Sequence, residues 1–179
     1  MMDHYRKVVF LMKKWLSLVL TLMMVLASVS ALAEEVYFDE SFVANIPGEF
    51  VLLEELGLVF YLPETMQAME MTEADIAGGG IAAFTDGTAS VSIAYAPVAD
   101  GAGAPITTLE QLIDFYNASG ITTVFRMLND IPCAAFSVED PSLSGIAYVD
   151  GSGNVLAFTG TPLTEEVAVM LTSIMAYAE

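Results

Sequence analysis

Two apolar runs, Leu143-Ser-Gly-Ile-Ala-Tyr-Val149 and Val155-Leu-Ala-Phe-Thr159, flank the segment Asp150-Gly-Ser-Gly-Asn154. Glycine and asparagine reach positive φ angles at low cost, and they are typical of tight turns. Because both flanking runs are rich in residues that favour strands, the whole stretch predicts a β-hairpin.

A helix is predicted directly after this hairpin. Thr161 or Thr164 can cap its N-terminus, Pro162 suits a first turn, and Glu165 and Glu166 lie where the helix dipole favours negative charge. The apolar residues that follow recur with helical spacing, which predicts one buried stripe. We expect this stripe to pack on the sheet that contains the hairpin; it consists of Val167, Met170, Leu171, Ile174 and Ala178.

The first 33 residues have the features of a secretory signal peptide. They contain a basic region with Arg6, Lys7, Lys13 and Lys14, an apolar run from Trp15 to Leu26, and the small-residue cleavage pattern Ala31-Leu32-Ala33. The apolar run is short for a membrane span, and an uncleaved anchor is the alternative interpretation. We therefore expect a secreted protein that has no stable membrane association after cleavage.

Removal of residues 1–33 would leave a strongly acidic chain. The full sequence has 5 Lys and Arg residues and 23 Asp and Glu residues, and the first 33 residues hold four of the basic residues and one acid. Residues 34–179 therefore have one basic and 22 acidic residues, a formal charge of −21. Such a charge keeps an apolar chain soluble, and it excludes binding that follows the phosphates of a nucleic acid.

Several catalytic side chains are missing from residues 34–179. The sole histidine and the sole tryptophan, His4 and Trp15, lie in the predicted signal, and no lysine remains after it. These absences exclude Ser-His-Asp catalysis, lysine Schiff bases and zinc sites of the usual His/Cys type. The single cysteine, Cys133, cannot form an internal disulfide.

The remaining pattern predicts an acidic leader over 34–48 and a single α+β domain over 49–179. Further strands are expected at 58–62, 66–71, 81–85, 89–96, 121–128 and 132–138, and Phe50 to Glu55 fits either a strand or a helix. The turn Asp86-Gly87 should join 81–85 and 89–96 in a second hairpin, and Asn129-Asp130 should link 121–128 to 132–138. A capping box from Thr107 to Glu110 should open a helix that ends before Gly120. We expect a mostly antiparallel sheet of about six to seven strands with two long helices packed on it.

The segment Gly57-Leu-Val-Phe-Tyr-Leu-Pro63 resembles the opening strand of PsbP/Mog1/DcrB-like domains. The later order is similar as well: a capped helix, strands separated by short turns that include Ile131-Pro132, a hairpin with a glycine-rich tip and a final helix. The resemblance covers most of 50–178. It implies a small α+β accessory or binding domain, often exported, and it carries over no catalytic residue.

Asp150, Ser152 and Asn154 place oxygen side chains at alternate positions, as calcium loops do. However, Val155 stands where such a loop needs glycine, and Thr161 stands where it needs a carboxylate. The pattern favours a plain hairpin turn, and a weak calcium site is the alternative. No other cofactor is expected.

Arg126 is the sole cation after residue 33, so we expect carboxylate neighbours; it forms either an ion pair or the anchor of an anionic ligand. For Cys133, burial in the core is favoured over an intermolecular disulfide or a catalytic thiol, because no basic group lies near it in sequence.

Other motifs have weaker chemical meaning. The adjacent carboxylate pairs Glu54-Glu55, Glu139-Asp140 and Glu165-Glu166 allow a glycosidase in principle, although neighbours in sequence usually lie on different faces. Gly78-Gly79-Gly80 is expected to form a turn. Met66, Met69 and Met71 fit core packing better than a binding groove.

The sequence thus favours a secreted, non-enzymatic domain that binds a protein, a cationic surface or a small ligand. A carboxylate-only hydrolase of extracellular glycan and a weak calcium-dependent structural module are the alternatives. The ligand itself is not encoded in any motif.

Overall fold

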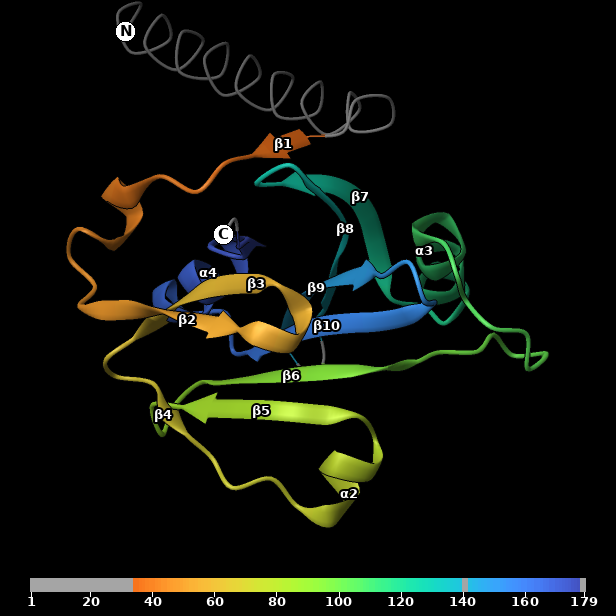
Figure 1. The fold of residues 1–179 in the computed structure, drawn as a ribbon, viewed down its shortest axis with the longest axis horizontal. Coiled ribbons are helices and arrows are strands. Elements are labelled where there is room, and N and C mark those ends of the chain that lie inside the picture. The colour runs from red at the N-terminus through yellow and green to blue at the C-terminus, as the bar shows by residue number, and fades with distance from the viewer. Residues whose placement is uncertain (1–33, 140–141, 178–179) are drawn as a thin grey trace, which may run out of the picture. The chain divides into compact units, whose positions relative to one another are not determined.

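The computed structural model describes residues 34–139 and 142–177, and residues 34–179 form one compact unit. The predicted signal peptide lies outside the described residues. The fold is α+β, with one large sheet, one small sheet and three α-helices (Figure 1).

The large sheet has eight strands in the order β1-β7-β8-β9-β10-β6-β5-β4. All neighbouring strands are antiparallel except β1 and β7, which pair in parallel. The expected hairpins are confirmed: β5 with β6, β7 with β8, and β9 with β10 each join through a short turn. The strands are β1 (Glu34–Val36), β4 (Gln67–Ala68), β5 (Gly80–Thr85), β6 (Ser90–Pro97), β7 (Thr122–Leu128), β8 (Ile131–Val138), β9 (Leu143–Val149) and β10 (Asn154–Thr161).

The prediction of one sheet with six to seven strands was wrong in the number of sheets and strands, because the structure has an eight-stranded sheet and a second, smaller one. Three strands form a separate antiparallel sheet in the order β11-β3-β2, comprising β2 (Gly48–Leu53), β3 (Leu58–Pro63) and β11 (Met175–Ala176). A short 3-10 helix, η3 (Glu54–Leu56), joins β2 to β3, and another, η2 (Glu40–Val43), precedes β2.

The helices are α2 (Glu73–Ala77), α3 (Leu109–Ala118) and α4 (Glu165–Thr172). The capping box of α3 lies one residue later than expected, because Thr108 and Gln111 form it, while the Gln111 side chain also accepts the Thr107 N–H. Thr164 caps α4, so Pro162 precedes the helix instead of occupying its first turn. The α4 helix ends at Thr172, earlier than the apolar stripe indicated, and Ala178 lies outside the described residues.

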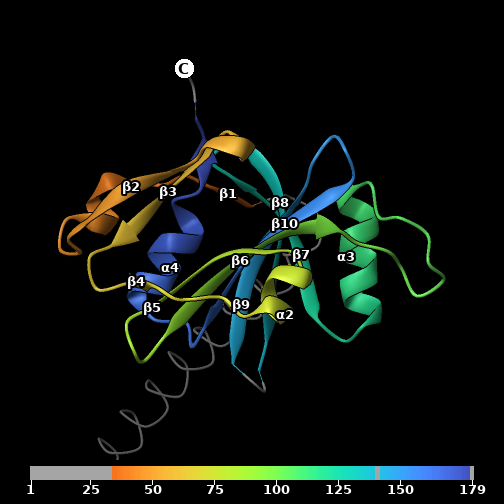
Figure 2. The ribbon, with the colours of Figure 1, turned by 60° about the horizontal axis from the view of Figure 1, so that its bottom comes forward.

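Helices pack on both faces of the large sheet. Helix α4 lies against β10, which confirms the prediction that its apolar stripe packs on the large sheet. It also lies against β3, so it fills the space between the two sheets. Helix α3 covers the opposite face over β7, β8 and β9 (Figure 2). The main core is formed by residues on the α4 side, including Phe60, Phe84, Ile93, Phe158, Met170 and Ile174.

The segment 34–48, predicted as an acidic leader, contributes edge strand β1. Besides the pairing of β1 with β7, Asn129 in the β7–β8 turn, which has a φ of 48°, connects this segment to the core. The Asn129 side chain accepts the Phe38 N–H at 2.6 Å and donates to the carbonyls of Thr172 and Ile174 at 3.0 and 2.7 Å. One side chain therefore ties the N-terminal segment, the β7–β8 hairpin and the end of α4 together.

We predict that Gly160→Ala destabilises the protein by about 2 kcal/mol, because α4 approaches β10 closely at this glycine. A Cβ there would lie 2.2 Å from Cγ1 of Val167, which is buried in α4. Urea unfolding measures the effect. The matched control is Gly151→Ala in the β9–β10 turn, where a Cβ meets nothing within 4 Å. Equal stability of the two variants would contradict close packing of α4 on β10.

Candidate functional site

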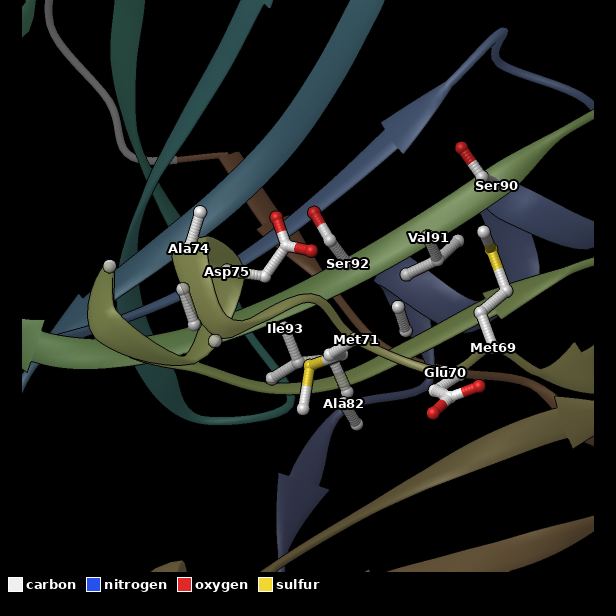
Figure 3. Close-up of a pocket in the computed structure, with 14 residues that line it drawn as sticks. Met69, Glu70, Met71, Ala74, Asp75, Ala82, Ser90, Val91, Ser92 and Ile93 are labelled. Atoms are coloured by element: carbon white, nitrogen blue, oxygen red, sulfur yellow. The ribbon is translucent and has the colours of Figure 1, made fainter.

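A groove lies over β5 and β6, beneath the short helix α2 (Figure 3). Its floor comes from β5 and β6, and its walls come from α2 and from the segment that leads into it. The cavity has a volume of about 440 Å³, within the size range of small-molecule sites. It is the candidate binding site of the described residues, and we call it the α2 groove.

The groove is open because the strands present small side chains on this face. In the antiparallel register, Ala83 lies opposite Ser92, Thr85 opposite Ser90, and Gly80 opposite Ala94. The alternate residues of the same strands, such as Val91 and Phe84, point into the main core instead. The period of two along a strand therefore separates a large-residue core face from a small-residue groove floor.

The glycine run predicted to form a turn brings α2 close to the sheet. A Cβ at Gly79 would lie 2.5 Å from Cβ of Ala96, and one at Gly80 would lie 2.8 Å from the carbonyl oxygen of Asp75. Gly79 also has a backbone φ of 87°, a conformation that residues with a side chain rarely adopt. Gly79 and Gly80 therefore allow α2 to lie close to the sheet at one end of the groove.

Two of the three predicted core methionines line this groove. Met66 is buried in the main core, as expected, but Met69 is 45% exposed and, like Met71, forms part of the groove wall. Figure 3 shows Met69 and Glu70 at one end and α2 at the other. The sequence interpretation favoured the core for these two residues, and no local signal in the sequence marked their place in the groove wall.

Asp75 is the groove carboxylate that the local structure holds in place. Its Oδ2 accepts the N–H of Thr72 at 2.9 Å and the Thr72 hydroxyl at 2.7 Å, which completes the capping box of α2. These hydrogen bonds lower the pKa of Asp75, with the Thr72 side chain as the largest cause. Asp75 is therefore ionised at neutral pH, and with Glu70 it makes the groove rim anionic.

The described aspartates with a shifted pKa give no support to the glycosidase alternative. Four of the described aspartates have a shifted pKa, and in each it is lowered, whereas a general acid needs a raised value; they are Asp39, Asp75, Asp86 and Asp150. Glu54 and Glu55 are exposed in η3, and Glu165 and Glu166 occupy the first turn of α4. Asp140 lies outside the described residues.

The predicted calcium segment forms the β9–β10 turn. Oδ1 of Asp150 accepts the N–H groups of Ser152 and Asn154, each at 2.8 Å. Its Oδ2 accepts the Tyr95 hydroxyl and, at 3.3 Å, the Asn154 side-chain amide. These bonds, led by that from Tyr95, lower the pKa of Asp150 to about 2. They support the hairpin interpretation, and the calcium alternative stays a prediction that calcium titration would test.

The described residues contain no cluster of three or more His, Cys, Asp or Glu side chains placed to hold a metal ion.

Arg126 and Cys133 lie opposite each other on β7 and β8. The Arg126 guanidinium donates to the Phe125 carbonyl at 3.1 Å, and the parallel pairing of β1 places Glu34 opposite it in register. Burial raises the pKa of the Cys133 thiol to about 11, although Arg126 opposes this shift. Cys133 is thus a buried core residue and a poor nucleophile, as the sequence favoured.

Comparison with solved structures shows a PsbP-like fold. The chain is similar to the solution structure of cyanobacterial PsbP (CyanoP) from Synechocystis sp. PCC 6803, with a TM-score of 0.50 and 11% sequence identity. The alignment covers 75% of this chain and 95% of that one. At this identity the likeness defines the fold, and it confirms the resemblance drawn from Gly57 to Pro63 and the later element order.

No protein-family model matches the sequence, and no curated protein matches it significantly. Among the described residues, no helix is both long enough and apolar enough to cross a membrane.

We predict that Asp150→Asn lowers stability at pH 7 by about 1 kcal/mol, because the charged acceptor of several hydrogen bonds is replaced by a neutral amide. The effect is modest because Asp150 is partly exposed and solvent screens its charge. The pKa of Asp150 is depressed to about 2 in the folded protein. The carboxylate therefore stabilises the fold fully above the pKa that Asp150 has in the unfolded chain, and this stabilisation is lost as the pH falls toward 2. Urea unfolding of both proteins between pH 7 and 2.5 should show the difference shrinking with acid. A constant difference would contradict the role of the charge.

We predict that Tyr148→Phe leaves stability unchanged or raises it by up to about 1 kcal/mol. The Tyr148 hydroxyl is buried without a hydrogen-bond partner among the described residues. Removing such a group removes a desolvation cost while the ring packing stays. Thermal unfolding measures the change, with Tyr61→Phe as the control that should destabilise, because the Tyr61 hydroxyl donates to the Ile46 carbonyl at 2.7 Å.

Proposed function

We propose that this protein is an exported, non-enzymatic binding domain that holds a small, mainly apolar ligand in the α2 groove. The observation that carries the proposal is the cavity of about 440 Å³ floored by small strand residues and walled by Met69 and Met71. Methionine side chains are flexible and polarisable, so they adapt to ligands of different shape. The sequence features of residues 1–33 support export.

The chemistry of the rim favours a neutral or cationic ligand. Glu70 and the ionised Asp75 border the cavity, and residues 34–179 have a formal charge of −21. An anionic ligand would meet this negative potential both during approach and at the rim. The absence of lysine and histidine after residue 33 argues for binding without acid–base or nucleophilic turnover.

A titration followed by ¹H–¹⁵N NMR tests this proposal with two ligands of matched shape. Tryptamine carries a cationic amine, and indole-3-propionate carries a carboxylate in its place. We expect tryptamine to shift the amide signals of residues 69–75, 80–83 and 90–94, because its ring fits an apolar cavity and its amine faces carboxylates. Indole-3-propionate should bind at least tenfold more weakly, a difference of about 1.4 kcal/mol.

A variant that fills the groove provides the second arm of this test. Ser92→Leu places a large side chain on the exposed groove floor and should weaken tryptamine binding about tenfold. Thr122→Leu, at an exposed position of β7, is the matched control and should bind as the wild type does. Shifts spread outside the groove, or equal binding by the Ser92 variant, would refute the proposal.

A further inference from the structure

The small sheet leaves one full strand edge without a neighbour. In the order β11-β3-β2, the six residues of β2 pair with β3 on one side, and no other described strand pairs with them (Figure 1). An unpaired edge presents backbone donors and acceptors to any extended chain that reaches it. Unlike the terminal strands of the large sheet, which are two and three residues long, β2 is long enough to template a new strand.

Three observations establish which β2 residues turn their backbone outward. The Glu64 N–H donates to the Pro47 carbonyl at 2.8 Å, so these two residues form a bonded pair. Pro63, which lies opposite Gly48, has no N–H to donate. The Tyr61 N–H, opposite Phe50, points away from β2 and donates to the Ser173 hydroxyl at 2.8 Å. Bonded and non-bonded pairs alternate in an antiparallel ladder. Phe50 and Leu52 therefore point their N–H and C=O groups away from β3.

The same two residues expose large apolar side chains. Phe50 is 49% exposed and Leu52 is 36% exposed. A pocket of about 380 Å³ adjoins the end of this edge and extends to Ile81 and Tyr95 of the large sheet. Leu52 and Leu53 both line it, although their side chains lie on opposite faces of β2, so the pocket opens at the strand's edge and end. A strand added beside Leu52 can place a side chain there.

Carboxylates stand at both ends of this apolar edge. Glu49 lies near its start, and Glu54 and Glu55 follow its end in η3. Pairing of β2 with a second copy would bring like charges together, and the one basic residue after the predicted signal, Arg126, lies in β7. Charge complementarity therefore disfavours a second copy and favours a basic partner.

We propose that the β2 edge binds, by strand addition, an extended segment of a partner protein in which a short apolar stretch is flanked by basic residues. Backbone hydrogen bonds to Phe50 and Leu52 supply the pairing, the pocket beside Leu52 takes one apolar side chain, and the terminal carboxylates select the flanking charges. This surface is distinct from the α2 groove, and the proposal does not depend on the groove being occupied.

Fluorescence anisotropy with the labelled peptide Lys-Lys-Val-Ile-Val-Lys-Lys tests the proposal on the unchanged protein. A peptide with the three central amides N-methylated keeps its charge and side chains but cannot pair as a strand. A peptide with glutamate in place of lysine keeps the backbone but reverses the charge. We expect both control peptides to bind at least tenfold more weakly. Equal binding of the N-methylated peptide would overturn strand addition.

Protein variants then locate the surface. Leu52→Pro removes an outward N–H without removing a bond to β3, so the small sheet should stay folded while peptide binding falls about tenfold or more. Leu52→Lys keeps the N–H and should weaken binding through charge repulsion. Unchanged affinity in both folded variants would place the site elsewhere. If sedimentation without peptide shows a dimer that Leu52→Pro dissociates, a second copy occupies the edge and the proposal is overturned.

Discussion

The burial of α4 between the two sheets is the constraint on which the rest of the fold depends. Val167 packs against Gly160 of β10 on one side, and the residues that follow the helix bind the small sheet on the other. Buried Ser173 accepts the Tyr61 N–H and donates to the Met170 carbonyl at 3.2 Å, while Asn129 satisfies the carbonyls of Thr172 and Ile174. The polar groups at the buried end of α4 thus have partners.

This arrangement determines which surfaces stay available for binding. The helix and the small sheet occupy one face of the large sheet, and α3 covers the β7–β9 part of the other. The face of β5 and β6 beneath α2 is therefore left for the groove, and β2 is left as an outer strand. Both candidate surfaces are parts of the two sheets that α3, α4 and neighbouring strands leave uncovered, and no chemical motif in the sequence marks either of them.

The local sequence signals predicted the parts of the fold that depend on neighbouring residues. Asp86-Gly87 and Asp150 to Asn154 identified hairpins, and threonine caps identified the helices, because turns and caps are short-range interactions. The separate small sheet was not predictable in this way: its β11 strand follows α4 directly, and its position depends on the contact between Tyr61 and Ser173, which are 112 residues apart. The groove was missed for the same reason, since Met69 and Ser92 line one cavity only because the Met69 N–H donates to the Ala83 carbonyl and Ala83 lies opposite Ser92 in the β5–β6 register.

The distribution of charge underlies the same proposed selectivity at both surfaces. Arg126 lies in β7, next to one edge of the large sheet, whereas the α2 groove lies at β5 and β6, toward the opposite edge. The sole cation after residue 33 is therefore separated from the groove carboxylates by several strands, and exposed charges at such distances are screened by physiological salt. Attraction of a basic ligand should weaken with salt, while its apolar contacts with Met69 or Leu52 should persist. In both proposals the acidic surface therefore governs encounter and exclusion, and the shape of each apolar site governs which ligand stays bound.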